Sequence, residues 1–215
     1  TPNDTDDPAI WYNAADPEKS LIRGTDKGDS TGGIFVFDLK GKLDTSRSIH
    51  NLSRPNNIDI EYGFSLDGKP IDIAVFTERG RDMIRVISLP DCKFIDNGGI
   101  PVFEDDSLKA PMGIGLYKNG DHEGLSLYKK PDGGGFIILS DQQANKFRVF
   151  TRNGTKNSPH EHQLLRIVKA QTLESDGSDM LNMPFNSTFP KGLFVAMSTN
   201  KTFLYYKAGD IVGID

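Results

Sequence analysis

Acidic side chains gather with turn-forming residues at three places in the sequence. The three clusters are Asp6-Asp7-Pro8, Asp121-His122-Glu123-Gly124 and Glu174-Ser175-Asp176-Gly177-Ser178-Asp179. Clustered carboxylates repel one another unless a cation lies between them, and oxygen ligands without a cysteine or a histidine pair favour Ca²⁺. The ligand spacing of an EF-hand is absent. Because aspartate and glycine are common in turns, each cluster taken alone is more simply a solvated acidic turn.

Two positively charged side chains stand beside turns, where they could meet an anionic substrate. Lys27 precedes a glycine-rich bend, and Arg79 stands at the end of an expected strand. A lysine ammonium and an arginine guanidinium both suit phosphate oxygens, although surface solvation is the simpler interpretation of each alone. Asn57 lies in a polar turn that enters a strand. The sequence contains no P-loop, nucleophile elbow or G-x-G-x-x-G motif.

Composition excludes several functional classes. The chain has 215 residues, with 25 Lys and Arg against 30 Asp and Glu, so its formal net charge is -5. This acidity argues against nucleic acid as the main partner, because a phosphate backbone requires clustered cations. The single cysteine, Cys92, excludes an intramolecular disulfide and a multi-cysteine zinc site.

The sequence also bears on membranes and on the compartment. No apolar run approaches the ~20 residues that a membrane-spanning helix needs. The chain opens on Thr1 rather than methionine, so we expect that a signal peptide has been removed. A chain with one cysteine fits either the cytosol or a bacterial periplasm. We expect a secreted or periplasmic monomer that acts on a small molecule.

Short apolar runs between turn residues predict an all-β chain. Several alternate apolar with polar residues, the period of a half-buried strand. The segment 163–170 could be a helix or a strand, and we favour a strand. A chain dense in strands could form a sandwich, a barrel or a propeller, and periodicity does not choose among them. The main runs are 34–37, 71–76, 83–89, 136–139, 147–150, 193–196 and 203–206.

Taken together, the motifs resemble the β-propeller phytases, the calcium-dependent phytate phosphohydrolases. The opening Asp6-Asp7-Pro8-Ala9-Ile10-Trp11 is the most specific match. The motifs that follow in order are Gly24-Thr25-Asp26-Lys27, Asn56-Asn57-Ile58-Asp59-Ile60-Glu61-Tyr62-Gly63-Phe64, Arg79, Glu123-Gly124-Leu125-Ser126-Leu127-Tyr128, Ser140-Asp141-Gln142-Gln143-Ala144-Asn145, Ser175-Asp176-Gly177-Ser178-Asp179 and Phe189-Pro190-Lys191-Gly192-Leu193-Phe194-Val195-Ala196. Nearly the whole chain takes part.

The resemblance implies a six-bladed propeller that holds several calcium ions in and over its central channel. It implies that a calcium-held water or hydroxide attacks the phosphorus of phytate, while the metals and cations neutralise the developing charge. Lys27 then resembles the lysine of the cleavage site, Arg79 an arginine shared between phosphates, and Asn57 a residue of the same mouth. Asp121 resembles a residue of the catalytic cluster. The implied calcium ligands are Asp7, Asp121, Glu123 and Asp176, with Asp6, Asp59 and Asp179 in addition.

The chain departs from the family pattern in its middle. At about 40–50 residues a blade, 215 residues are too few for six blades. The family has about two blades where this chain has only residues 118–120, which explains why Gly113-Ile114-Gly115-Leu116-Tyr117 is echoed by 124–128. The missing block normally supplies a phosphate-binding lysine and two glutamates that bridge calcium ions. We therefore expect one domain over residues 1–215, with an internal deletion around 118–120 and an incomplete or four-bladed ring.

Three functions remain open from the sequence. The first is a calcium-dependent phosphatase that acts on phytate or related phosphate esters. The second is a non-catalytic, calcium-binding remnant of a propeller, which is suggested by the missing block and by Met112 where many members have a tyrosine. The third, ranked lowest, is another calcium propeller hydrolase, such as a lactonase that acts on sugar acids.

Overall fold

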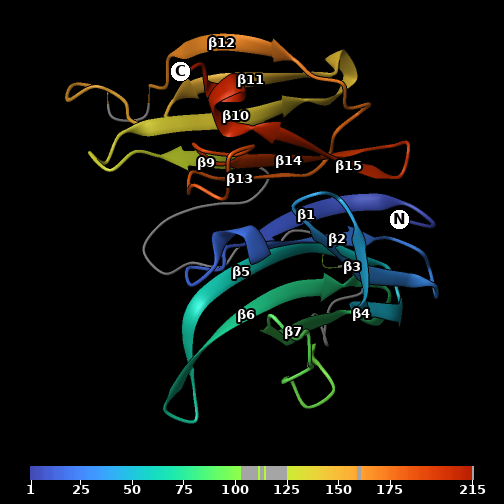
Figure 1. The fold of residues 1–215 in the computed structure, drawn as a ribbon. Coiled ribbons are helices and arrows are strands. Elements are labelled where there is room, and N and C mark those ends of the chain that lie inside the picture. The colour runs from blue at the N-terminus through green and yellow to red at the C-terminus, as the bar shows by residue number, and fades with distance from the viewer. Residues whose placement is uncertain (103–110, 112–113, 115–124, 159–160, 215) are drawn as a thin grey trace.

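Four antiparallel sheets make up the described part of the chain (Figure 1). The computed structural model describes all residues except 103–110, 112–113, 115–124, 159–160 and 215. The expected deletion around 118–120 therefore lies outside the described residues. None of the described helices is long and apolar enough to cross a bilayer.

Each sheet is a meander, in which strands that follow one another in sequence are neighbours. The first sheet contains β1 (Thr5–Trp11), β2 (Leu21–Asp26), β3 (Gly32–Asp38) and β4 (Leu43–Leu52). The second contains β5 (Pro55–Leu66), β6 (Lys69–Glu78), β7 (Met83–Leu89) and β8 (Ile100–Pro101). The third contains β9 (Leu125–Lys129), β10 (Gly135–Asp141), β11 (Lys146–Thr151) and β12 (Leu164–Lys169). The fourth contains β13 (Ser178–Leu181), β14 (Leu193–Ser198) and β15 (Thr202–Lys207).

Helical segments in the described chain are short. They are the 3₁₀ turns η1 (Pro17–Lys19), η2 (Arg79–Arg81) and η3 (Gln142–Ala144) and the helix α1 (Ala208–Val212). The segment 163–170, which could be read either way from sequence, contains strand β12, so that prediction is confirmed. The prediction of an all-β chain is confirmed as well.

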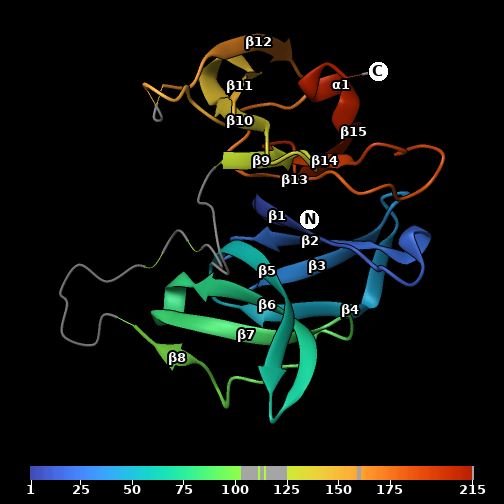
Figure 2. The ribbon, with the colours of Figure 1, turned by 90° about the vertical axis from the view of Figure 1, so that its left-hand side faces the viewer.

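The sheets follow one another as blades around an incomplete ring. Strand β1 lies beside β5 on one side and beside β13 and β14 on the other, and β13 lies beside β9 (Figure 2). The spatial order is therefore second, first, fourth and third sheet. The ring is not closed, and the second and third sheets form its two ends. This confirms the expected incomplete ring.

Apolar side chains hold neighbouring sheets together at three interfaces. The alternation of strand side chains lets one strand serve two interfaces. On β14, Leu193 and Val195 pack against the first sheet, whereas Phe194 and Ala196 pack against the third. All six residues of β14 are buried, because sheets cover both of its faces.

A buried arginine stands in the interface between the first and second sheets. Arg23 is 0% exposed and pairs in register with Ala9 and Val36, which belong to that apolar interface. Its Nη2 atom donates to the carbonyl oxygen of Pro90 at 3.3 Å. Its Nε and Nη1 atoms lack a hydrogen-bond partner among the described residues. Burial lowers the pKa of Arg23, and the nearby Cys92 thiol, a weak acceptor, opposes this only in part.

A second buried arginine, on β7, is fully paired. The Nη1 atom of Arg85 lies 2.7 Å from Oε2 of Glu78, and its Nε atom lies 2.7 Å from Oδ2 of Asp96. Burial alone would raise the pKa of Asp96, but hydrogen bonds from Arg85 and from the N–H of Val86 hold it below its usual value. Arg85 therefore has the two counter-charges that Arg23 lacks.

The contrast between the two arginines predicts opposite effects of the same substitution. Arg23→Met should raise the free energy of unfolding by about 1–2 kcal/mol, because it replaces a poorly paired buried charge with an apolar chain of similar length. Arg85→Met should lower it by about 3–5 kcal/mol, because the buried Asp96 loses its counter-charge and Glu78 keeps only Arg81. Urea unfolding monitored by circular dichroism measures both. A destabilised Arg23→Met protein would contradict this account of Arg23.

The Arg85 cluster also predicts an acid dependence of stability. Because the pKa of Asp96 is lower in the folded than in the unfolded state, its contribution is complete at neutral pH and is lost as the pH falls through the folded-state value. The Asp96→Asn variant should therefore lose less stability than the parent chain between pH 6 and pH 3. Urea unfolding at both pH values measures the difference, and equal losses would refute it.

Candidate functional site

The candidate site forms where the innermost strands of three sheets begin. Asp6 and Asp7 are the second and third residues of β1, and Thr5 pairs in register with Asp26, so Lys27 follows directly beside them. The backbone N–H of Lys27 donates to the carbonyl oxygen of Asp4 at 2.7 Å. Because β5 and β13 flank β1, the first residues of these strands reach the same region.

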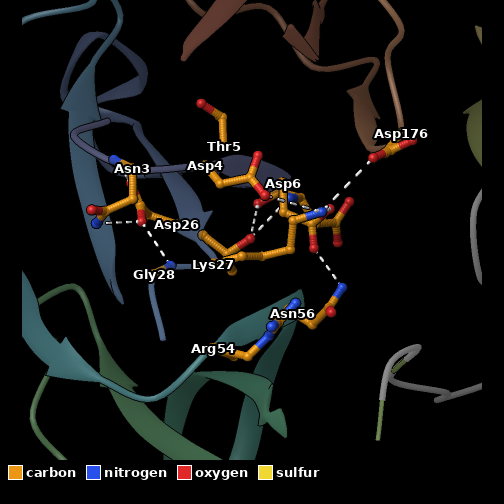
Figure 3. Close-up of polar contacts among 12 residues, drawn as sticks. Asn3, Asp4, Thr5, Asp6, Asp26, Lys27, Gly28, Arg54, Asn56 and Asp176 are labelled. Carbon is orange, nitrogen blue, oxygen red and sulfur yellow. Dashed lines mark hydrogen bonds and ion pairs between the residues drawn. The ribbon is translucent and has the colours of Figure 1, made fainter. Parts of the chain in front are cut away.

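The ammonium of Lys27 lies among three carboxylates (Figure 3). Its Nζ atom is 3.1 Å from Oδ1 of Asp6, 3.8 Å from Oδ2 of Asp176 and 3.9 Å from Oδ2 of Asp4. The Lys27 side chain is 19% exposed. The other carboxylate oxygen of Asp6 accepts a hydrogen bond from the side-chain amide of Asn56. The structure therefore brings together Lys27, Asp6 and Asp176, which the sequence analysis had proposed separately.

Burial makes the charge of Asp6 costly. This residue is 5% exposed, and burial raises its pKa, an effect that the neighbouring Lys27 opposes. Asp176 and Asp4 act in the same direction as burial, because their negative charges disfavour a further carboxylate. The ionised form of Asp6 thus depends on a cation close by.

Asp7 is held by the backbone of two strands. Its N–H donates to Oγ1 of Thr25 at 2.8 Å, and its Oδ2 atom accepts from the N–H of Ile58 at 3.2 Å. Burial raises the pKa of Asp7 well above its usual value. A hydrogen bond from the side chain of Asn57 lowers it in part, so Asn57 lies beside Asp7.

A glycine lets the Asp176 loop approach β1. A Cβ atom added at Gly177 would lie 2.5 Å from Oδ1 of Asp7 and 2.8 Å from the Cα atom of Asp7. Real side chains do not pack that closely, so only glycine allows this approach. The absence of a side chain at position 177 thus brings Asp176 within reach of Lys27.

Residues that the sequence analysis gave no role hold this loop from the third sheet. Oγ of Ser140 donates to the carbonyl oxygen of Ser175 at 2.7 Å, and Oδ1 of Asn145 accepts from the N–H of Glu174 at 2.7 Å. The Nε2 atom of Gln142 donates to Oδ1 of Asp176. The motif 140–145 was visible in the sequence, but nothing in it indicated that its partner lies about thirty residues further on.

Asp179 and Asp59 lie further along the strands and are bound by backbone. The N–H of Ile10 donates to Oδ2 of Asp179 at 2.8 Å, and the N–H of Met180 donates to its Oδ1 at 2.7 Å. Burial raises the pKa of Asp179 to about 6, and the charge of Asp59 acts in the same direction. Oδ1 of Asp59 accepts from the N–H of Ile60 at 2.7 Å.

Arg79 lies in η2, at the end of β6. Its backbone N–H donates to the carbonyl oxygen of Arg54 at 3.1 Å, which ties η2 to the residues that lead into β5. Its side chain is half-buried, and the described residues form no ion pair with it. The structure thus places Arg79 near the start of β5 but does not join it to the Lys27 cluster directly.

The described residues provide oxygen donors for a cation but only part of the predicted ligand set. Asp121 and Glu123 lie outside the described residues. Within the described chain, no group of three or more His, Cys, Asp and Glu side chains is arranged to hold a metal ion. The available donors are carboxylate and amide oxygens, the type that Ca²⁺ prefers, and the Lys27 ammonium already stands among them as a cation. In donor chemistry, these residues fit calcium.

The close approach at Gly177 predicts a sharp effect of one added methyl group. Gly177→Ala should lower the free energy of unfolding by about 2 kcal/mol, because its Cβ collides with the backbone and side chain of Asp7. Gly134→Ala is a matched control, since its Cβ would meet only the side chain of Asp132, at 3.1 Å. Thermal and urea unfolding compare them, and equal small losses would show that the loop can move away freely.

One known protein aligns with most of this chain at low sequence identity. A 3-phytase of Bacillus subtilis (strain 168) is 24% identical over 286 residues, which cover 89% of this chain and 73% of that protein. Because the aligned stretch exceeds the 215 residues of the chain, the relative carries residues that this chain lacks.

One solved structure and one family model also match this chain. An exo-β-1,3-galactanase from Clostridium thermocellum overlaps 95% of this chain and 61% of its own length, with a TM-score of 0.42 and 8% identity. The family model described as Phytase matches residues 1–94 and 108–203, which is most of the chain. The chain therefore belongs to the phytase family.

Proposed function

We propose that this chain is a calcium-dependent phosphomonoester hydrolase that acts on phytate, myo-inositol hexakisphosphate. The single observation that supports this most directly is the ammonium of Lys27, a partly exposed side chain, beside carboxylates of the first sheet and of the connection into the fourth, in a member of the phytase family. A polyanionic substrate needs cations at its binding site, and the net charge of -5 makes bound metal ions a natural source of them.

The proposed calcium ligands are carboxylates from several strands, two of which, Asp6 and Asp176, lie beside the Lys27 ammonium. Asp6, Asp7 and Asp176 would hold the ions nearest Lys27. Asp59 and Asp179, further along the strands, and Asp121 and Glu123, from the segment outside the described residues, would complete the set. Bound calcium would neutralise phosphate oxygens and activate water for attack on phosphorus.

The remaining residues of the site would bind and orient the substrate. Lys27 can place a positive charge on a phosphate oxygen of the ester to be cleaved, because its side chain is partly exposed. Arg79 can bind a phosphate through two N–H groups, since no carboxylate among the described residues pairs with it. Asn57 can hold Asp7 in place while its neighbour Asn56 does the same for Asp6.

The compartment and the assembly are parts of the same proposal. Loosely built oxygen sites for calcium are filled mainly outside the cytosol, where the ion is abundant. This favours a secreted or periplasmic protein. We also propose that the protein acts as a monomer.

The alternative is a calcium-binding propeller remnant without catalytic activity. The open ring favours it, because two sheets end the series without a described neighbour to complete a central channel. The phosphatase and the remnant would use the same carboxylates, but only the phosphatase would release phosphate from phytate.

Phosphate release from phytate tests the proposal. The chain should release phosphate with Ca²⁺ and stop when a chelator is added. Lys27→Met should lower kcat/KM by about a hundredfold or more, because a charge aimed at the reacting phosphate is lost. Lys19→Met, which removes an exposed lysine paired with Asp16, should leave kcat/KM unchanged.

The outcomes distinguish the phosphatase from the calcium-binding remnant. A folded chain that releases no phosphate, but whose melting temperature rises with Ca²⁺, would support the remnant. A chain with neither phosphate release nor a response to Ca²⁺ would overturn both.

A further inference from the structure

The carboxylates proposed for calcium are already occupied by a cation of the chain itself. The Nζ atom of Lys27 lies 3.1 Å from Oδ1 of Asp6 and 3.8 Å from Oδ2 of Asp176. Asp6 comes from the first sheet, whereas Asp176 comes from the connection that leads into the fourth. Lys27 therefore spans the same gap between sheets that a bound metal ion would span.

We infer that Lys27 is an internal counter-ion that competes with calcium for Asp6 and Asp176, so that calcium binding releases the Lys27 ammonium toward the anionic substrate. The inference rests on the proposed function, because it concerns the same site. It adds a role for Lys27 in the metal-free protein, where the residue stabilises the carboxylates before any substrate is present.

Because Asp6 is buried, its ionised carboxylate needs either the Lys27 ammonium or a calcium ion beside it. Its side chain is almost fully enclosed, and one carboxylate oxygen is used by the amide of Asn56. The other oxygen faces Lys27. If calcium takes this oxygen, a monovalent and a divalent cation would stand within a few ångströms, and their repulsion disfavours joint occupancy. The two cations should therefore exclude each other.

The geometry lets the ammonium leave while its backbone stays in place. The backbone of Lys27 is tied to the carbonyl oxygen of Asp4, and the N–H of the next residue, Gly28, donates to Oδ1 of Asp26 at 3.1 Å. The side chain has four flexible methylene groups and is 19% exposed. Rotation about these bonds can move the charge from the carboxylates to solvent or to a bound phosphate.

Calcium affinity tests the competition without reference to catalysis. Isothermal titration of the whole chain with CaCl₂ should give a Kd about tenfold lower for Lys27→Met than for the parent chain, because calcium no longer displaces an ammonium. Lys19→Met removes one positive charge far from the carboxylate cluster and controls for net charge. Its Kd should change by less than about twofold. Equal changes in both variants would overturn the inference.

A second measurement uses the unaltered chain, in case Lys27→Met does not fold. Lysine amines are labelled by brief reductive methylation and quantified by peptide mass spectrometry, with Ca²⁺ and with a chelator. Calcium should increase labelling of Lys27 several-fold, while labelling of Lys19, which is 77% exposed, should stay constant. Labelling of Lys27 that does not respond to bound calcium would overturn the inference.

The outcomes also distinguish this inference from the proposed function. If calcium binds the parent chain and supports phosphate release, but neither affinity nor labelling depends on Lys27, only the competition is wrong. If calcium does not bind the parent chain, the proposed calcium site and the competition are both wrong.

Discussion

The structure depends on strand β1, which has a sheet packed on each of its faces. Ala9 and Trp11 point toward the second sheet, and Ile10 points toward the fourth. Alternation along one strand therefore fixes three sheets relative to one another. The same strand begins with Asp6 and Asp7, so apolar packing at one end determines where the charged residues stand at the other. Strand β1 therefore positions both the apolar core and the charged residues of the site.

Charge balance is the second constraint on the site. Several carboxylates approach one another where strands of different sheets begin, and burial raises the pKa values of Asp6, Asp7 and Asp179. The chain meets this cost with hydrogen bonds from backbone and amide groups and with the ammonium of Lys27. Such an arrangement suits binding of cations, since each added positive charge relieves repulsion that the fold has built in.

The alternation of apolar and polar residues was sufficient to predict the strands, and the order of the motifs was sufficient to predict the family. The run 193–196 became the doubly covered strand β14, and the segment 163–170 contains β12. Contacts between distant segments were not predictable in the same way. The approach of Gly177 to Asp7 and the hold of Gln142 on Asp176 depend on how sheets pack, which alternation within a strand does not encode. Lys27 was predicted to bind phosphate, yet in the structure its ammonium lies beside carboxylates.

The open ring gives the molecule ends that a closed propeller would not have. Blades joined only to their neighbours behave like the units of a linear repeat array, in which terminal units lose a single interface when they unfold and inner units lose two. The second and third sheets are the terminal units here, and the first and fourth are the inner ones. Asp6, Asp7 and Lys27 belong to the first sheet and its edge, and the Asp176 loop leads into the fourth. Fraying from the ends would therefore leave the strands that carry Asp6, Asp7 and Lys27 in place longest, but it would first remove the bonds by which Asn56 and Gln142 hold Asp6 and Asp176.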